Sequence, residues 1–248
     1  MSDNIIYFPS PSKFNDPFDC SISFRPDLAT KDQVVQYRYQ RYKEEQPLQK
    51  DSILRKLAKD DYKQKRHKNP VLIKQFNEQV IDVQRYKHGI FSLTPSYYSL
   101  LMWSHYANSH KGFCIGFNVY RLLSFTSEYL YKKKGLSIAL FKVTYPSEYP
   151  IINSFALEQT DKLPSITTKS DVWSYEHEYR LILLNKANHK EELPKDIIRR
   201  VILGCKISSE DKKDIINILK NRKDAIHLYQ AKLSENKYGL DFEHINYK

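Results

Sequence analysis

The sequence has few glycines and few cysteines, and it lacks long apolar runs. Only 6 of its 248 residues are Gly, and neither GxGxxG nor GxxxxGK[ST] occurs. Glycine-rich loops that cradle phosphates are therefore not expected. Cys20, Cys114 and Cys205 are odd in number and far apart in the chain, which argues against a disulfide framework and favours a cytoplasmic location. No stretch approaches the length of a membrane span and the N-terminus has no signal pattern, so we expect no membrane association.

Positive charge is in excess. The sequence has 40 Lys and Arg against 29 Asp and Glu, a net charge of +11, which suits an anionic partner such as nucleic acid. Helical spacing in residues 32–39, 51–58 and 71–86 predicts a helical, basic insertion at about 30–87. A cluster of cations precedes Pro70: Lys63, Lys65, Arg66 and Lys68. Two interpretations stay open for this insertion, a solvated helix face and a phosphate-binding surface.

Strand and helix patterns interleave without the regular alternation of a doubly wound fold. Apolar, β-branched or aromatic runs predict strands at 5–8, 88–94, 113–117, 139–145, 199–203 and 226–233. Helical spacing predicts helices at 97–106 and 208–220, and residues 147–172 read as a loop-like or weakly helical connection. We therefore predict an α+β fold in a single domain, residues 1–248, which is long enough to bury a substantial core.

The stretch from Trp173 to Leu184 is the most informative one. It begins with aromatic and ionisable residues and ends in an aliphatic run, as does a strand that enters a core. Alternation along such a strand would put Glu176, Glu178 and Arg180 on one face. Carboxylates near a core are costly unless they are neutralised or used. A structural ion pair with Arg180 and a catalytic role are both compatible with this pattern.

Metal ligands are not evident in the sequence. His105, His110 and Cys114 lie close together in the chain, but their spacing matches no tight ligand pair and no fourth ligand is apparent. We therefore expect no bound metal.

Five motifs occur in an order that is specific in combination. They are FNDPF (14–18), FSLT (91–94), MWSHYA (102–107), HKGFCIGF (110–117) and WSYEHEYR (173–180). With them the chain resembles a widespread bacterial family of uncharacterised domains, often found with mobile elements and defence genes. The resemblance covers about residues 5–230 apart from the basic insertion. It implies a domain of unknown function and partner proteins from a defence operon.

A second resemblance concerns chemistry. ADP-ribosyltransferases share a split-sheet α+β fold with three marks: an aromatic, His or Arg on the first strand, a Ser/Thr strand followed by aromatics, and a late strand with a Glu, often as Glu-x-Glu. Ser92 and Thr94 followed by tyrosines are similar to the second mark, and Glu176-x-Glu178 to the third. Members of the first family usually carry a further strand with Tyr and basic residues, and Tyr7 is the residue here that would substitute for it.

The second resemblance implies an ADP-ribosyltransferase-like split β-sheet core with flanking helices, and NAD as co-substrate. Glu178 would stabilise the oxocarbenium-like ribose, Glu176 would orient or deprotonate the acceptor, and Ser92 would position Glu178 or the ribose. The residues implied to bind the co-substrate are Tyr97 or Tyr98 on nicotinamide, Arg180 or Arg25 on pyrophosphate, and Tyr7, Thr94, Trp103 and His105. The enzyme would act as a defence or toxin effector on nucleic acid or protein.

Two other classes of protein remain open. One is a non-catalytic module that binds nucleic acid or acts as a sensor, in which the aromatics are core residues and Glu176 and Glu178 pair with Arg180. The other is a metal-dependent nuclease, which would need clustered carboxylates, with Asp16, Asp19, Glu176 and Glu178 as the candidates.

Overall fold

The computed structural model describes residues 4–155 and 163–247 of the chain. Their contacts divide the chain into two compact units. The first unit comprises Met1–Ser10, His88–Val143 and Val172–Lys248, and the second comprises Pro11–Lys87 and Thr144–Asp171. The helices expected at 30–87 thus belong to a unit that is larger than the expected insertion.

The described part of the first unit contains three β-sheets. The orders are β2-β5-β4 and β3-β7-β8-β9, and β1 pairs with β6. Every pairing is antiparallel except that of β7 with β8. The strands are β1 Ile5–Phe8, β2 Gly89–Leu93, β3 Phe113–Phe117, β4 Ile138–Lys142, β5 Tyr179–Leu183, β6 His189–Glu192, β7 Ile198–Leu203, β8 His227–Leu233 and β9 Leu240–Ile245. With the helices described below, they confirm the α+β class.

Strand β5 lies in the centre of its sheet and carries the aliphatic run. Leu181, Ile182 and Leu183 are each 1% exposed. A strand that is covered on both faces needs a continuous apolar run rather than alternation. Leu181 and Leu183 join a core cluster with Phe8 of β1 and Leu130.

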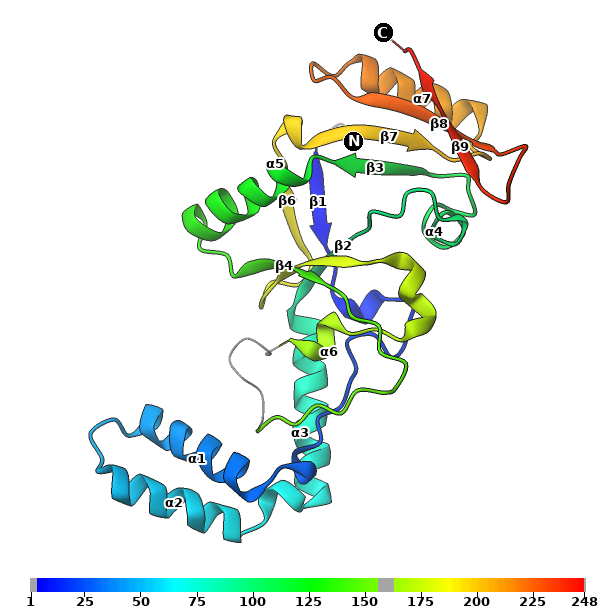
Figure 1. The fold of residues 1–248 in the computed structure, drawn as a ribbon. Helices are drawn as coiled ribbons and strands as arrows, with labels where there is room; N and C mark the ends of the chain where they lie inside the picture. The colour runs from blue at the N-terminus through cyan, green and yellow to red at the C-terminus, as the bar shows by residue number, and fades with distance from the viewer. Residues whose placement is uncertain (1–3, 156–162, 248) are drawn as a thin grey trace. The chain divides into compact units, whose positions relative to one another are not determined.

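Helix α7, Ser209–Lys220, connects the parallel strands β7 and β8 of the four-stranded sheet (Figure 1). Ser208 caps the helix, because its side chain accepts a hydrogen bond from the backbone N–H of Asp211 at 3.0 Å. Ile215 and Leu219 of α7 belong to one core cluster with Val201 of β7. The strands expected at 199–203 and 226–233 and the helix expected at 208–220 are confirmed.

One of the scarce glycines is required by a close backbone approach. A Cβ atom at Gly204, directly after β7, would lie 2.1 Å from the backbone oxygen of His110 and 2.8 Å from that of Gly112. The backbone N–H of Gly204 also donates to the oxygen of Gly112 at 2.9 Å. Only a residue without a side chain fits this crossing.

In the first unit one helix follows β2, and two joined helices follow β3. Helix α4, Leu100–Tyr106, starts after Ser99, whose hydroxyl accepts from the N–H of Met102 at 3.4 Å. Tyr97 and Tyr98, which were expected inside this helix, therefore precede it. Helix α5, Val119–Ser124, continues directly into a π-helix, Phe125–Lys133.

The second unit is mainly helical. Its helices are α1 Lys31–Glu45, α2 Asp51–Lys63, α3 Pro70–Asp82 with a π-helical end Val83–Lys87, and α6 Pro164–Thr167. A capping box of Thr30 and Gln33 starts α1, and Leu54 and Ala58 of α2 pack on Tyr39, so that α1 and α2 form a hairpin (Figure 1). The helices expected at 32–39, 51–58 and 71–86 are present. Residues 156–162 of the expected connection lie outside the described residues.

The strand predicted from Trp173 to Leu184 begins later than expected. Asp171–Glu176 is a 3-10 helix, His177 has a left-handed φ of 46°, and β5 starts at Tyr179. The reason lies in the neighbouring strand, because β2 ends at Leu93, which pairs with Tyr179, and Pro95 has no N–H to extend the ladder. The prediction that Glu176 shares a strand face with Glu178 and Arg180 is therefore wrong. Strands β6 and β9 were not predicted.

Candidate active site

The pairing of β2 with β5 brings two distant motifs together. Ser92 of FSLT is directly opposite Arg180 of WSYEHEYR, and Leu93 is opposite Tyr179. Glu178 precedes the first residue of β5. The end of the Ser/Thr strand and the Glu-x-Glu motif thus meet where β2 ends and β5 begins, which we call the edge of this sheet.

Glu178 and Arg180 form a buried, bidentate ion pair. The Nε and Nη2 atoms of Arg180 donate to Oε1 and Oε2 of Glu178, each at 2.9 Å. The side chains are 0% exposed for Arg180 and 7% for Glu178. Planar fork-to-fork geometry is the strongest form of such a pair and fixes the carboxylate plane.

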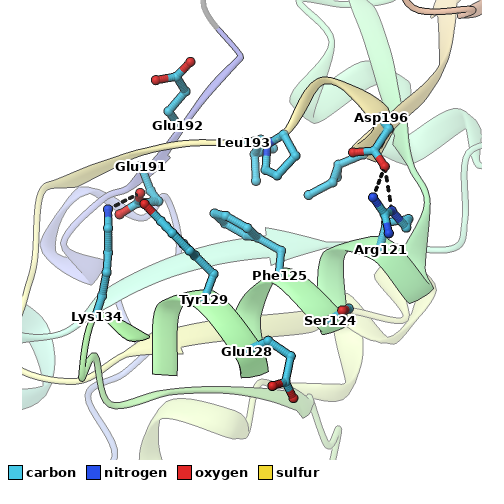
Figure 2. A pocket seen from close by; sticks show the side chains of 12 residues that line it. Arg121, Ser124, Phe125, Glu128, Tyr129, Lys134, Glu191, Glu192, Leu193 and Asp196 are labelled. Carbon is cyan, nitrogen blue, oxygen red and sulfur yellow. Dashed lines mark hydrogen bonds and ion pairs between the residues drawn. The ribbon is translucent and has the colours of Figure 1, made fainter. Parts of the chain in front are cut away.

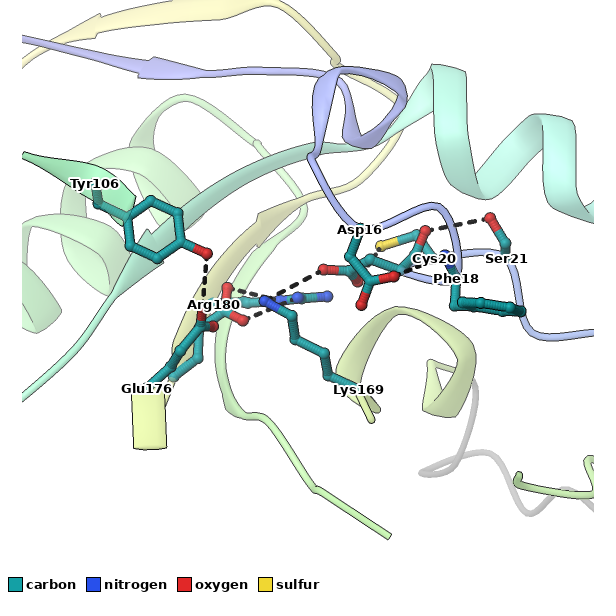
Figure 3. A network of polar contacts seen from close by, with 10 residues as sticks. Asp16, Phe18, Cys20, Ser21, Tyr106, Lys169, Glu176 and Arg180 are labelled. Atoms are coloured by element: carbon teal, nitrogen blue, oxygen red, sulfur yellow. Dashed lines mark hydrogen bonds and ion pairs between the residues drawn. The ribbon is translucent and has the colours of Figure 1, made fainter. Parts of the chain in front are cut away.

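Glu176 binds a different partner. The hydroxyl of Tyr106, at the end of α4, donates to Oε1 of Glu176 at 2.6 Å (Figure 3). Glu176 is 3% exposed, whereas Tyr106 is half exposed. Burial raises the pKa of the neighbouring Tyr175 hydroxyl, and the negative charge of Glu176 raises it further. A guanidinium thus binds Glu178, and a phenol donates to Glu176.

Side chains after β2 tie that strand to the segment before β5. The Thr94 hydroxyl donates to the backbone oxygen of Glu176 at 2.5 Å and accepts from the N–H of Ser96 at 2.9 Å. The Ser96 hydroxyl lies 2.8 Å from Nδ1 of His177. Ser92 is exposed, and its hydroxyl makes no hydrogen bond with a described residue. Thr94 therefore fixes the backbone of the motif, while Ser92 is open to an outside group.

The expected co-substrate aromatics have partners within the first unit. Trp103 is 3% exposed and its Nε1 donates to the backbone oxygen of Tyr97 at 2.7 Å, so it is a core residue. The rings of Tyr97 and Tyr98 meet edge to face at 5.6 Å, and the two residues are 40% and 57% exposed. His105 stacks on Tyr175 with centroids 6.4 Å apart. Trp103 is therefore buried, whereas the tyrosine pair and His105 are exposed.

One candidate for the co-substrate lies apart from this edge, and another belongs to the second unit. Tyr7 is on β1, which pairs with β6 rather than with β2, and its hydroxyl donates to Oδ1 of Asn188 at 2.6 Å. Arg25 belongs to the second unit, where it forms an exposed bidentate pair with Asp27. The Asp27 carboxylate, through a hydrogen bond and its charge, raises the pKa of Arg25.

A cavity of about 620 Å³ lies elsewhere in the first unit. Figure 2 shows Phe125 and Tyr129 of the π-helix between two ion pairs, that of Arg121 with Asp196 and that of Lys134 with Glu191. Burial raises the pKa of Glu191, but hydrogen bonds from Lys134 and His189 outweigh burial and leave the pKa below its ordinary value. None of the residues expected to be functional lines this cavity. Arg121 and Asp196, which pair at this cavity, are 75 positions apart in the chain. No local sequence pattern could therefore have predicted the cavity.

The FNDPF loop of the second unit contributes buried acids. Nζ of Lys169 lies 3.9 Å from Oδ2 of Asp19, and both side chains are nearly inaccessible. Asp16 accepts from the N–H of Phe18 at 2.9 Å. Asp16, Asp19 and Lys169 line a cavity of about 240 Å³. Lys169 was not expected, because a single Lys in a loop carries no motif.

Two further properties concern only the described residues. No three His, Cys, Asp or Glu side chains among them are grouped so that they could hold a metal ion. None of their helices combines the length and the hydrophobicity that are needed to cross a bilayer.

Comparison with known proteins finds one family. Residues 102–181 match the family model described as a protein of unknown function (DUF2971). The matched segment, about a third of the chain, runs from α4 to β5 and so includes Tyr106, Glu176 and Glu178. This match supports the resemblance to a family of uncharacterised domains. No curated protein and no solved structure matches the chain.

Proposed function

We propose that the chain is an ADP-ribosyltransferase-like enzyme that uses NAD as co-substrate and acts as a bacterial defence or toxin effector. The observation that carries the proposal is the adjacency of the Ser/Thr strand β2 to β5, the strand that Glu178 precedes. This adjacency agrees with a split-sheet core in which the second and third marks of the transferases meet. The match to a domain of unknown function neither names an activity nor opposes one.

In the proposed reaction the bond between ribose C1 and the nicotinamide nitrogen breaks, and its electron pair leaves with nicotinamide. The Glu178 carboxylate stabilises the oxocarbenium-like ribose, and Arg180 is a positioning residue that holds the carboxylate plane. An acceptor nucleophile then forms the new bond to C1 and gives its proton to Glu176. Nucleic acid is the proposed acceptor, since the chain carries a net charge of +11.

The exposed groups at the sheet edge take the remaining roles. Ser92 has no hydrogen bond to a described residue, so its hydroxyl is available to the ribose. Tyr97 and Tyr98 present partly exposed rings on which nicotinamide can stack. Tyr7, which lies on β1 and donates to Asn188, has no part in the proposed reaction.

The test measures nicotinamide release and transfer of label from NAD to nucleic acid or protein. We expect Glu178→Gln to lower the rate by about 10²-fold or more, as does the loss of one preorganised electrostatic group. Ser92→Ala removes an exposed hydroxyl without a partner, so it is expected to lower the rate while thermal unfolding stays unchanged. The control is Glu235→Gln, which makes the same charge change at an exposed residue. Absence of NAD binding and turnover with every acceptor tested would exclude the transferase.

A non-catalytic nucleic-acid-binding or sensing module is the second candidate. The bidentate pair of Glu178 with a fully buried Arg180 favours it, because such a pair also serves to order a core. In this case Ser92→Ala would change nothing, and nucleic-acid binding would be unaffected by Glu178→Gln in the folded protein.

A further inference from the structure

Positive charge is concentrated in the helices of the second unit. Residues 31–87 carry 15 Lys and Arg against 8 Asp and Glu, so they contribute +7 of the chain's net +11. A cluster of positive charge on these helices is the first requirement for a phosphate-binding surface. The structure separates the cations that the hairpin uses internally from those that it leaves to solvent.

Several cations have partners within the hairpin. Arg41 pairs with Glu45 at 3.0 Å, Arg38 with Asp61 at 3.5 Å, and Lys63 with Asp60 at 2.8 Å. The guanidinium of Arg55 lies 4.3 Å from the centre of the Tyr39 ring. The contacts of Arg38 and Arg55 join α1 to α2, those of Arg41 and Lys63 lie within one helix, and all four leave less of that charge for an outside partner.

Five other cations form what we call the basic face. They are Lys56 and Lys59 on α2, and Lys65, Arg66 and Lys68 in the 3-10 turn that follows it. All five are exposed, and none has a side-chain hydrogen bond or ion pair with a described residue. Lys56 and Lys59 lie on the side of α2 opposite Leu54 and Ala58, which pack on α1. Lys56 and Lys59 are therefore turned away from the core of the hairpin, and the other three cations are exposed in the turn that follows.

The loop that carries three of these cations is held rigidly. His67, between Arg66 and Lys68, is 7% exposed. Its ring stacks on Tyr62 at 5.3 Å and meets Phe155 edge to face at 6.2 Å. Lys65 adopts a left-handed φ of 50° that turns the chain after α2. Because the loop is anchored, little conformational entropy is lost when its cations bind a partner.

We propose that the basic face binds the phosphate backbone of double-stranded nucleic acid without reading its sequence. Sites for single strands interleave cations with exposed aromatic rings on which bases stack. The basic face has no aromatic member, and the ring of Tyr62, at the end of α2, stacks on His67. A group of exposed cations without rings suits contacts to the phosphates of a duplex. This proposal does not depend on the transferase reaction.

The test measures the affinity of the full chain for a labelled 20-base-pair DNA duplex by fluorescence anisotropy between about 50 and 200 mM salt. If all five cations contact phosphates, log K is expected to fall with log salt with a slope of about −4.5. The fourfold variant Lys56→Gln, Lys59→Gln, Lys65→Gln and Arg66→Gln is expected to reduce this slope by about 3.6, or 0.9 for each lost contact.

The matched control removes the same charge from cations that have acidic partners. It is the fourfold variant Arg41→Gln, Lys74→Gln, Lys132→Gln and Lys237→Gln, whose members form exposed i,i+4 pairs with Glu45, Glu78, Glu128 and Asp241. We expect it to keep most of the wild-type slope. An equal loss in both variants would show that only net charge matters and would overturn the proposal. Tighter binding of the single strand than of the duplex, or no binding of either, would also overturn it. Circular dichroism confirms that each variant is folded.

Discussion

Removal of one partner from the buried pair of Glu178 and Arg180 should destabilise the first unit strongly. In Glu178→Gln the guanidinium of Arg180, which is 0% exposed, loses the carboxylate that binds it through two hydrogen bonds of 2.9 Å. Removal of one partner from a buried ion pair typically costs about 3–5 kcal/mol. Arg180→Met should cost a similar amount, because it leaves the Glu178 carboxylate without its bidentate donor.

The double variant Glu178→Leu and Arg180→Met should lose less free energy of unfolding than the sum of the losses in the two single variants. Replacement of both ions by apolar side chains of similar size removes the desolvation cost as well as the attraction, and is often close to neutral. In a cycle whose single variants are Glu178→Leu and Arg180→Met, the coupling free energy is therefore expected to be at least about 2 kcal/mol in magnitude, within the range measured for groups in contact.

Urea unfolding, followed by tryptophan fluorescence, measures these changes, since Trp103 and Trp173 both lie in the first unit. The exposed pair of Arg41 and Glu45, with side chains 53% and 52% exposed, is the control. Its loss should cost no more than about 0.5 kcal/mol. Single variants of the buried pair that cost less than about 1 kcal/mol, or a double variant that is simply additive, would refute the electrostatic reasoning.

Three further predictions concern single side chains. Gly204→Ala should lower the unfolding temperature by several degrees in a thermal melt, since its Cβ would lie 2.1 Å from the backbone oxygen of His110; an unchanged melt would contradict this. Thr94→Val should lower the free energy of unfolding in urea by about 1 kcal/mol, because the backbone oxygen of Glu176 loses a hydrogen bond. Thr94→Ser keeps the hydroxyl and should retain most of the wild-type stability. Burial, together with the nearby charges of Lys68 and Arg38, lowers the pKa of His67. The unfolded chain then binds the proton first, so stability should decline as the pH falls below about 6.5, and His67→Phe should weaken this decline between pH 7 and pH 5.

Local patterns predicted most of the regular structure. The capped helix α7 and the strands on either side of it were found because Ser208, the acidic first turn and the aliphatic runs are signals within a few residues. Helices α1 and α2 were found for the same reason. Strand β6 was missed, because His189-Lys-Glu-Glu has no apolar member and pairs only because β1 lies beside it. Its strand conformation is set by a partner more than 180 positions away, which no local pattern contains.

The candidate site depends even more on distant contacts. Sequence alone selected Glu178 and Ser92, and the pairing of β2 with β5 brings their two motifs to one edge. The failed expectation concerned Glu176, because the end of β2 at Leu93 stops the ladder and lets the chain turn at His177. The hydroxyl of Tyr106 then binds Glu176 across 70 positions of sequence. The alternation of side chains along one strand contains no information about this contact between Tyr106 and Glu176, so it could not have been predicted.

The two proposed roles of Glu178 make different demands on the same pair. A structural role requires only that charge and volume be matched, so the Leu and Met double variant should fold. A catalytic role requires a carboxylate at that position, so the same double variant should be folded and have no NAD turnover. A folded double variant therefore separates stability from chemistry, which neither single variant can do. If the wild type turns over NAD and the folded double variant does so at the same rate, Glu178 is a structural residue and the catalytic carboxylate lies elsewhere.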